Sequence, residues 1–225
     1  DAVDLEFLQE DLPKTMGSIQ VGAERIRNIV RSLQRFARSD DSAAAPVNLH
    51  DGLDNTLMIL QHRLRANAKG PEIALVKQYG DLPPVSCQAG RINQVFMNVL
   101  SNAIEALEEQ YQRQLGREAL SPQDGRPRHL LPHHQGKLTL ITSAEAGKAT
   151  IRIIDNGPGM STDVKARLFD PFFTTKPVGK GTGLGLSISH RIIVAHQGCI
   201  DYISTPGQGT ECRITLPVHS RLPLA

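Results

Sequence analysis

The first forty residues carry apolar side chains at a regular spacing of seven. The main series consists of Leu5, Leu12, Ile19, Ile26 and Leu33, and a weaker series three residues further along consists of Leu8, Thr15, Gly22, Ile29 and Phe36. A seven-residue repeat is typical of a helix that packs along other helices in a bundle or coiled coil. We place the main helix at about residues 11–39, with Asp11 as its N-cap and Pro13 in its first turn, after the end of an earlier helix. Residues 1–40 thus form one unit, and residues 41–46, within SDDSAAAP, are predicted to be a linker.

From residue 47 onward, helical and strand-like patterns alternate. Helices are predicted over residues 49–66, 89–110 and 186–196, and strands over residues 73–79, 137–144, 149–155, 199–204 and 211–216. The last four strands are expected to form two hairpins. Residues 112–136 are polar, rich in Pro and His and without periodicity, which predicts a loop insertion. The result is an α+β domain of residues 47–220, in which three helices lie on one mixed, mainly antiparallel sheet.

Composition and charge exclude several classes of function. A net charge of +2 leaves no basic field for nucleic acid or an anionic membrane, and three Tyr with no Trp offer few rings for base stacking. The three cysteines form no C-x-x-C pair, which favours a reducing compartment over a disulfide framework or zinc site. No apolar run approaches the roughly 20 residues that cross a bilayer. We therefore expect a cytoplasmic location without membrane contact for these residues. The chain begins with Asp, so we interpret it as part of a longer protein, itself either soluble or membrane-anchored.

Two short stretches place polar side chains among apolar ones. In NVLSNAIEAL, Asn98 and Asn102 lie four residues apart and share one face of the predicted helix. Such amides need polar partners once covered, which a ligand or the core itself can supply. In IRIIDNGPGM, a strand ends in Asp155, whose carboxylate can accept a hydrogen bond from an exocyclic amine, and Gly157 and Gly159 let the backbone approach a ligand. The same string also fits an ordinary turn.

Two further stretches follow along the chain. LFDPFFTTK gathers Phe169, Phe172 and Phe173, which we expect to anchor a loop in the core. In GKGTGLGLSIS, glycines run into an amphipathic helix, so that backbone N–H groups and the positive end of the helix dipole suit a polyphosphate. The spacing matches neither a Walker loop nor the glycine-rich hairpin of protein kinases.

Together and in this order, the four stretches resemble the N, G1, F and G2 boxes of sensor histidine kinases, within the GHKL ATPase superfamily. GTECRITLP resembles the last box of that family, and DLPKTMGSIQVGAERIRNIVRSLQRFAR resembles the second helix of the dimerization and histidine-phosphotransfer hairpin. The resemblance covers about residues 47–218 apart from the insertion. It implies a two-layer α/β sandwich of the GHKL ATPase fold, preceded by a long helix through which the protein forms a homodimer.

The resemblance also implies a site for ATP and Mg²⁺. Asn102 would ligate the Mg²⁺ that bridges the ATP phosphates, and Asn98 would line the phosphate site. Asp155 would accept a hydrogen bond from the adenine amine, in a pocket shaped by Gly157 and Gly159, and Thr210 would support the adenine edge. Residues 160–183 would form the ATP lid, whose phosphate-cradling end consists of Gly181, Thr182, Gly183, Leu184 and Gly185.

The sequence departs from the family at one point of this site. Many members have Lys-Tyr where Glu105-Ala106 stands here, so the cation beside the γ-phosphate has to come from elsewhere. Lys176 and Lys180 of the lid are our candidates. Solvated lid charges are the alternative interpretation of both.

The activity implied by the resemblance is transfer of the γ-phosphate to a histidine, followed by relay to the receiver domain of a response regulator. None of the eight histidines has the acidic context of the family's phosphoacceptor, so we expect that residue on the hairpin upstream of Asp1. Three loop histidines, His129, His133 and His134, are not expected to hold a metal. Two alternatives stay open: a regulatory module that only senses nucleotide, and an ATPase of the gyrase or chaperone type. Those ATPases carry a water-activating Glu where Asn98 stands, which favours transfer over hydrolysis.

Overall fold

The computed structural model describes residues 44–67, 70–119, 135–177 and 181–219, together with Met16 and Gln20, both helical. The predicted dimerization helix therefore lies almost wholly outside the described residues. The three loop histidines and Lys180 lie outside them as well.

Five strands form one mixed sheet, as predicted. They are β2 (Ala74–Tyr79), β4 (Lys137–Glu145), β5 (Lys148–Asp155), β6 (Cys199–Thr205) and β7 (Gly209–Pro217). Their order across the sheet is β2-β4-β5-β7-β6. β2 runs parallel to β4, and the other neighbours are antiparallel. Both predicted hairpins, β4–β5 and β6–β7, are confirmed.

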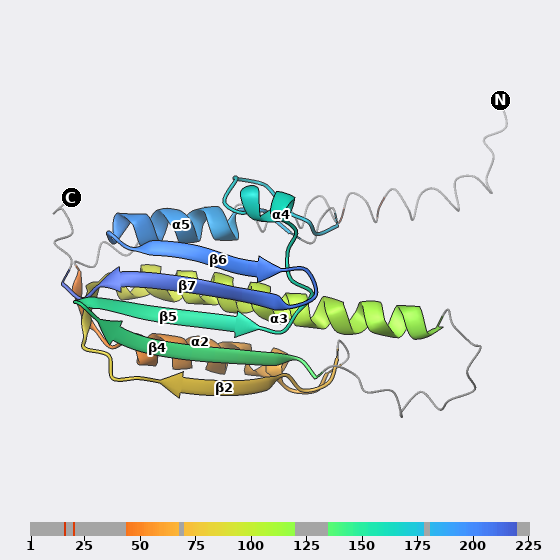
Figure 1. Cartoon of the computed structure of the whole chain (residues 1–225), viewed down its shortest axis with the longest axis horizontal. Helices are drawn as coiled ribbons and strands as arrows, with labels where there is room; N and C mark the ends of the chain where they lie inside the picture. The colour runs from red at the N-terminus through yellow and green to blue at the C-terminus, as the bar shows by residue number, and fades with distance from the viewer. Residues whose placement is uncertain are drawn as a thin grey trace.

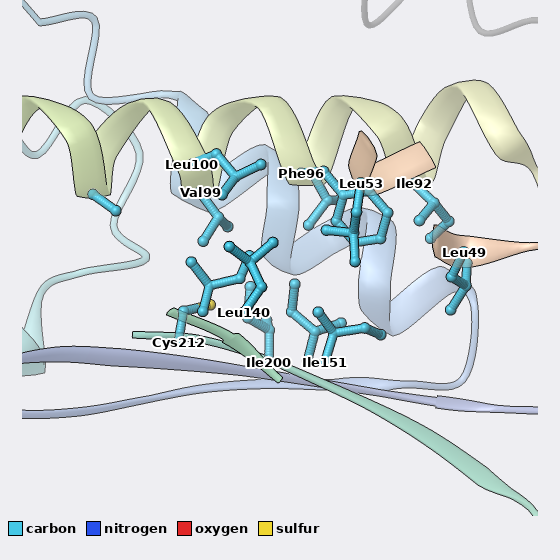
Figure 2. Close-up of a cluster of buried hydrophobic side chains, with 14 of the residues drawn as sticks. Leu49, Leu53, Ile92, Phe96, Val99, Leu100, Leu140, Ile151, Ile200 and Cys212 are labelled. Carbon is cyan, nitrogen blue, oxygen red and sulfur yellow. The ribbon is translucent and has the colours of Figure 1, made fainter. Parts of the chain in front are cut away.

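Three helices cover one face of this sheet and form the second layer (Figure 1): α2 (Leu49–Leu64), α3 (Ala89–Ala119) and α5 (Gly185–Ala195). The core fills the space between the two layers. Leu53 and Phe96 reach from the helices toward Leu140 and Ile151 on the strands (Figure 2), and all four are fully buried. Strand side chains alternate between this core and the opposite face, as the two-residue period of a strand requires.

The end of the long helix differs from the prediction. α3 continues to Ala119, so the first residues of the predicted loop insertion 112–136 are helical. No proline occurs between Pro84 and Pro122, and Gln, Arg, Leu and Glu are good helix formers. An ion pair one turn apart, Glu109 Oε2 to Arg113 Nη2 at 3.3 Å, supports this part. This part of α3 carries no continuous apolar stripe, so the hydrophobic period of the sequence did not predict it.

Three short elements were also missed. Part of the predicted linker 41–46 belongs to β1 (Ala45–Val47), which pairs antiparallel with β3 (Val85–Cys87) in a second sheet. α4 (Thr162–Ala166) begins after Ser161, whose side chain accepts a hydrogen bond from the N–H of Val164. Elements of three to five residues are too short for a hydrophobic period to reveal.

The outer face of the sheet carries a cluster of ion pairs. Arg152 on β5 donates two hydrogen bonds to the Glu211 carboxylate on β7, at 2.8 and 2.7 Å, and Arg213 donates to the same carboxylate. The hydrogen bonds from Arg152, followed by those from Arg213, outweigh the effect of burial and lower the pKa of Glu211 to about 2. Since the pKa in the folded protein lies below the ordinary Glu value of 4.5, the stabilisation is present above pH 4.5 and is lost as the pH falls toward 2.

We expect Glu211→Gln to lower the free energy of unfolding at pH 7, because it removes the charge that both arginines bind. The loss should be only about 1–2 kcal/mol, because both arginines are partly exposed and solvent screens the ion pairs. The difference from the parent should shrink as the pH is lowered from 5 to 3. Urea unfolding at pH 7, 5 and 3 measures it. The matched control is Glu145→Gln at the exposed end of β4. A difference that stays constant down to pH 3 would contradict the assignment.

Candidate functional site

A cavity of about 650 Å³ opens between α3, the carboxyl end of β5 and the segment that joins β5 to α5. The predicted site residues that line it are Asn98, Asn102, Asp155, Gly159, Lys176, Gly181, Thr182, Gly183, Gly185 and Thr210. Residues from all five sequence motifs thus meet at one place, although they are spread over more than a hundred positions of the chain.

Two predicted residues lie beside the cavity rather than on its wall. Gly157 donates its N–H to Asp155 Oδ1 at 2.8 Å. The side chain of Leu184 belongs to the hydrophobic core, so a contact with phosphate would fall to its backbone.

A buried carboxylate marks one end of the cavity. Asp155 is the last residue of β5 and is only 6% exposed. Burial raises its pKa to about 6, although backbone N–H groups of Gly157 and Thr210 oppose the shift. A largely buried carboxylate that lines a cavity is a strong acceptor for a ligand's N–H donor.

Ser204 fixes the wall beside this carboxylate. Its hydroxyl accepts a hydrogen bond from the N–H of Met160 at 2.8 Å, donates to the carbonyl of Gly209 at 2.9 Å and lies 2.9 Å from Thr210 Oγ1. Strand β6 is thereby tied to the start of the lid and to β7. Ser204 was not among the predicted site residues, although a polar residue at an inward-facing position of β6 was a usable signal.

Gly159 and Gly183 sit where another residue type would clash. Gly159 has a φ of 68°, and a Cβ there would lie 2.1 Å from the carbonyl oxygen of Thr205. Gly183 has a φ of 66°, and a Cβ there would lie 2.3 Å from the carbonyl carbon of Phe172. The N–H of Phe172 in turn donates to the Gly183 carbonyl at 2.9 Å. These glycines let the two ends of the lid approach their neighbours closely.

The predicted aromatic anchor is only partly confirmed. Phe169 packs against His190 of α5 and Tyr202 of β6, with ring centroids 4.7 and 5.9 Å apart. Phe172 is instead 61% exposed, because its φ of 66° turns it away from the core. Phe173 lines the cavity and lies under the guanidinium of Arg167.

The other end of the cavity combines two amides with a helix terminus. Asn98 donates through Nδ2 to the Gly185 carbonyl at 3.0 Å and to Ser189 Oγ at 3.2 Å, so it joins α3 to α5. Asn102, one turn further along, lines the cavity. Among the residues that the structure describes, no side chain caps the start of α5. Its free N–H groups and positive dipole end suit an anion.

The lid lysine already has a partner in the structure. Lys176 Nζ forms an ion pair with Glu105, which also lies 3.5 Å from Arg63 Nη1. Arg63 itself makes two hydrogen bonds with Glu108, at 3.1 and 2.8 Å. Glu105 thus holds the lid against α3 at the place where the family has a lysine. The sequence could not reveal this contact, because 71 positions separate the two residues.

The family model described as "Histidine kinase-, DNA gyrase B-, and HSP90-like ATPase" matches residues 87–220, more than half of the chain. The chain belongs to this ATPase family.

Within this ATPase family, the relatives with similar sequences include sensor histidine kinases. The sensor kinase CckA of Brucella abortus (strain 2308) is 35% identical over 201 residues, which cover 89% of this chain and 20% of the relative. The sensory histidine kinase/phosphatase NtrB of Rhodobacter capsulatus is 32% identical over 201 residues, which cover 86% of this chain and 49% of the relative. The chain therefore spans at most about half the length of these relatives. The predicted resemblance to sensor histidine kinases is confirmed.

Solved structures confirm the fold. The catalytic domain of histidine kinase ThkA aligns with a TM-score of 0.59 at 24% identity, covering 78% of this chain and 95% of that one. Full-length ShkA in complex with AMPPNP aligns with a TM-score of 0.65 at 23% identity, covering 95% of this chain and 40% of that one.

No described helix is long and apolar enough to cross a membrane. Within the same residues, no group of three or more His, Cys, Asp or Glu side chains is placed to hold a metal ion.

Proposed function

We propose that this chain is the ATP-binding catalytic portion of a sensor histidine kinase, which transfers the γ-phosphate of ATP to a histidine on a helical hairpin outside these residues. The observation that carries the proposal is the polarity of the cavity. A buried acceptor, Asp155, stands at one end, and the uncapped start of α5 with the two amides of α3 stands at the other. A volume of about 650 Å³ suits a ligand of nucleotide size.

In this proposal the adenine of ATP lies at the end of the cavity formed by Asp155. The carboxylate accepts a hydrogen bond from the adenine amine, and Gly157 holds the carboxylate through its N–H. Gly159 and Thr210 shape the surrounding wall. Thr210 reaches the base through its hydroxyl, whose other neighbour is Ser204.

The phosphates then lie at the start of α5, where Gly181 to Gly185 supply backbone N–H groups. Asn102 fits a magnesium site, since it lines the cavity and an amide oxygen is a hard ligand; phosphate oxygens and water would complete the shell. Bound Mg²⁺ would neutralise charge on the phosphates. Asn98 keeps its carbonyl oxygen for the metal or its waters, because its amide nitrogen is engaged with α5.

Lys176 is our candidate for the cation beside the γ-phosphate. It lines the cavity, and its ion pair with Glu105 keeps it there before the nucleotide arrives. Lys180 is the second candidate and lies outside the described residues.

Phosphoryl transfer requires positioning and charge neutralisation more than covalent chemistry by the protein. The nucleophile is the imidazole of the hairpin histidine, with an acidic neighbour as base, and the domain moves on the linker to reach it. ThkA has been solved in complex with the response regulator TrrA, and it aligns with this chain with a TM-score of 0.62. We propose a response regulator receiver domain as the partner here too. The homodimer through the N-terminal helix and the cytoplasmic location stay predictions.

The test is phosphoryl transfer in trans. We expect labelled ATP to leave the chain itself unlabelled and to label a separate polypeptide that carries the upstream hairpin helix. The phosphate should be acid-labile and base-stable. ATP binding without any transfer would favour the nucleotide-sensing module, and rapid release of phosphate without an acceptor would favour the hydrolase. Either result would overturn the proposed activity.

A further inference from the structure

The hydroxyl of Ser204 takes part in three hydrogen bonds, and together they fix the direction of each. The N–H of Met160 donates to Ser204 Oγ at 2.8 Å. The same Oγ lies 2.9 Å from both the carbonyl oxygen of Gly209 and Thr210 Oγ1. A hydroxyl has one hydrogen and two lone pairs. The carbonyl of Gly209 can only accept, so the single hydrogen of Ser204 points to it, and Thr210 is the donor in the third bond.

Burial keeps this arrangement from reversing. Ser204 is 7% exposed, and the ladder between β6 and β7 holds it opposite Thr210. If Ser204 turned its hydrogen toward Thr210, the carbonyl oxygen of Gly209 would face a lone pair at 2.9 Å instead of a donor. Loss of the donor to a buried acceptor is unfavourable. The hydrogen of Thr210 is therefore committed to Ser204, and its hydroxyl offers any other neighbour a lone pair.

Thr210 and Asp155 are neighbours on the cavity wall. Both residues line the cavity, and they are direct partners in the ladder between β5 and β7. Burial raises the pKa of Asp155, and a hydrogen bond from the backbone of Thr210 opposes this shift, so the carboxylate lies beside Thr210. An ionised carboxylate can only accept. The two side chains thus both present acceptors at this end of the cavity. A water held between them would give them both its hydrogens and would face a ligand as an acceptor too.

We infer that Ser204 is a positioning residue of the nucleotide site. By taking the hydrogen of Thr210, it leaves two acceptors on the wall, Thr210 and Asp155, which select a base with an exocyclic amine. The inference rests on the proposed function. The 6-amine of adenine carries two hydrogens, one for each acceptor. A purine without this amine offers only ring nitrogens on that edge, which accept, and it leaves both protein groups without a donor. Ser204 acts through Thr210 and does not line the cavity itself.

The experiment compares ATP with purine riboside triphosphate, which lacks the 6-amine and adds no bulk, by calorimetry at pH 8. Asp155 is ionised there, because its pKa is about 6. Thr210→Val removes the hydroxyl and keeps the shape of the side chain. We expect this variant to bind ATP about three- to tenfold more weakly, the effect of one lost hydrogen bond, and purine riboside triphosphate unchanged or more tightly. The preference for ATP should fall accordingly. Thr210→Ser keeps the hydroxyl and should keep the preference.

Ser204→Ala tests the positioning role. It should lower the thermal midpoint, because the N–H of Met160 and the carbonyl of Gly209 each lose a partner. A purely structural loss would weaken both nucleotides equally. We expect instead that the preference for ATP falls about three- to tenfold, because the freed hydroxyl of Thr210 can donate to a ring nitrogen. In the double variant with Thr210→Val, the preference should equal that of Thr210→Val alone, since Ser204 then has no hydroxyl to orient.

Thr215→Val is the matched control. Thr215 lies on the same strand, on the opposite face of the sheet and outside the cavity lining, so this variant should bind both nucleotides like the parent. An equal loss for both nucleotides in Ser204→Ala would overturn the inference, and so would effects that multiply in the double variant. A Thr210→Val variant that keeps the parent's preference would overturn it even if Ser204→Ala does not fold. If Asp155→Asn alone binds ATP more weakly, the inference fails and the proposed function stands. If the parent chain binds no ATP, both fail.

Discussion

Asp155→Asn is expected to weaken the binding of both ATP and ADP by about ten- to a hundredfold. The buried carboxylate offers only acceptors, whereas an amide can present a donor to the adenine amine and leave it unpaired. An unpaired buried polar group costs about 1–3 kcal/mol, and more where a charged hydrogen bond is lost. Both nucleotides should suffer alike, because both contain adenine. Calorimetric titration measures the two affinities.

The ligand-free Asn variant should nevertheless be at least as stable as the parent at pH 7. Burial raises the pKa of Asp155 to about 6, above the ordinary Asp value of 3.8. The contribution of this carboxyl to stability is therefore fully present below pH 3.8 and is lost as the pH rises through 6. Loss of affinity without loss of stability separates a binding role from a structural one. Asp163→Asn, on the exposed surface of α4 and outside the cavity lining, is the control and should bind like the parent.

Asn102→Ala should weaken the binding of Mg²⁺ rather than the binding of adenine. We expect phosphoryl transfer to fall a hundredfold or more and Mg²⁺-dependent ATP binding to weaken, because a ligand of the ion that neutralises the phosphates is removed. Binding of ADP without metal should be largely spared. Alanine is the best helix former, so α3 should stay intact. Transfer assays over a range of Mg²⁺ concentrations, paired with metal-free ADP titration, measure the split.

Asn98→Ala provides the contrast on the same helix face. Asn98 bonds Gly185 and Ser189 of α5, so its loss should lower the thermal midpoint as well as the affinity. If Asn102→Ala weakened metal-free ADP binding as much as it weakened Mg²⁺-dependent ATP binding, Asn102 would not be a magnesium ligand.

The sequence predicted the parts of this site whose chemistry is local. Asp155 could be recognised because it directly follows a run of β-branched residues that predicts a strand. Asn102 could be recognised because it lies one helical turn after Asn98, a second Asn on the same face. The sheet followed from alternation in β4, β5, β6 and β7, where each strand has one face on the core. The resemblance to a family then assigned roles in ATP and Mg²⁺ binding to these residues, which no single motif indicates by itself.

What the sequence missed depends on contacts between distant segments. The ion pair of Lys176 with Glu105 arises only when the lid folds over α3. Beyond residue 110, α3 carries too few apolar residues for a hydrophobic period to predict its extension to Ala119. Tyr202 looked like an ordinary strand residue, yet its hydroxyl oxygen is fully buried in the folded chain. Burial of a polar group is a property of the packed structure, so a one-dimensional pattern does not reveal it.

The most direct test of the nucleotide site is one calorimetric series with ATP and ADP, with and without Mg²⁺, on the parent chain, Asp155→Asn and Asn102→Ala. We expect the parent to bind both nucleotides and Asp155→Asn to bind both more weakly. Asn102→Ala should lose chiefly the Mg²⁺-dependent part of ATP binding. Two variants that bind both nucleotides like the parent, under every condition, would contradict the site and the function built on it.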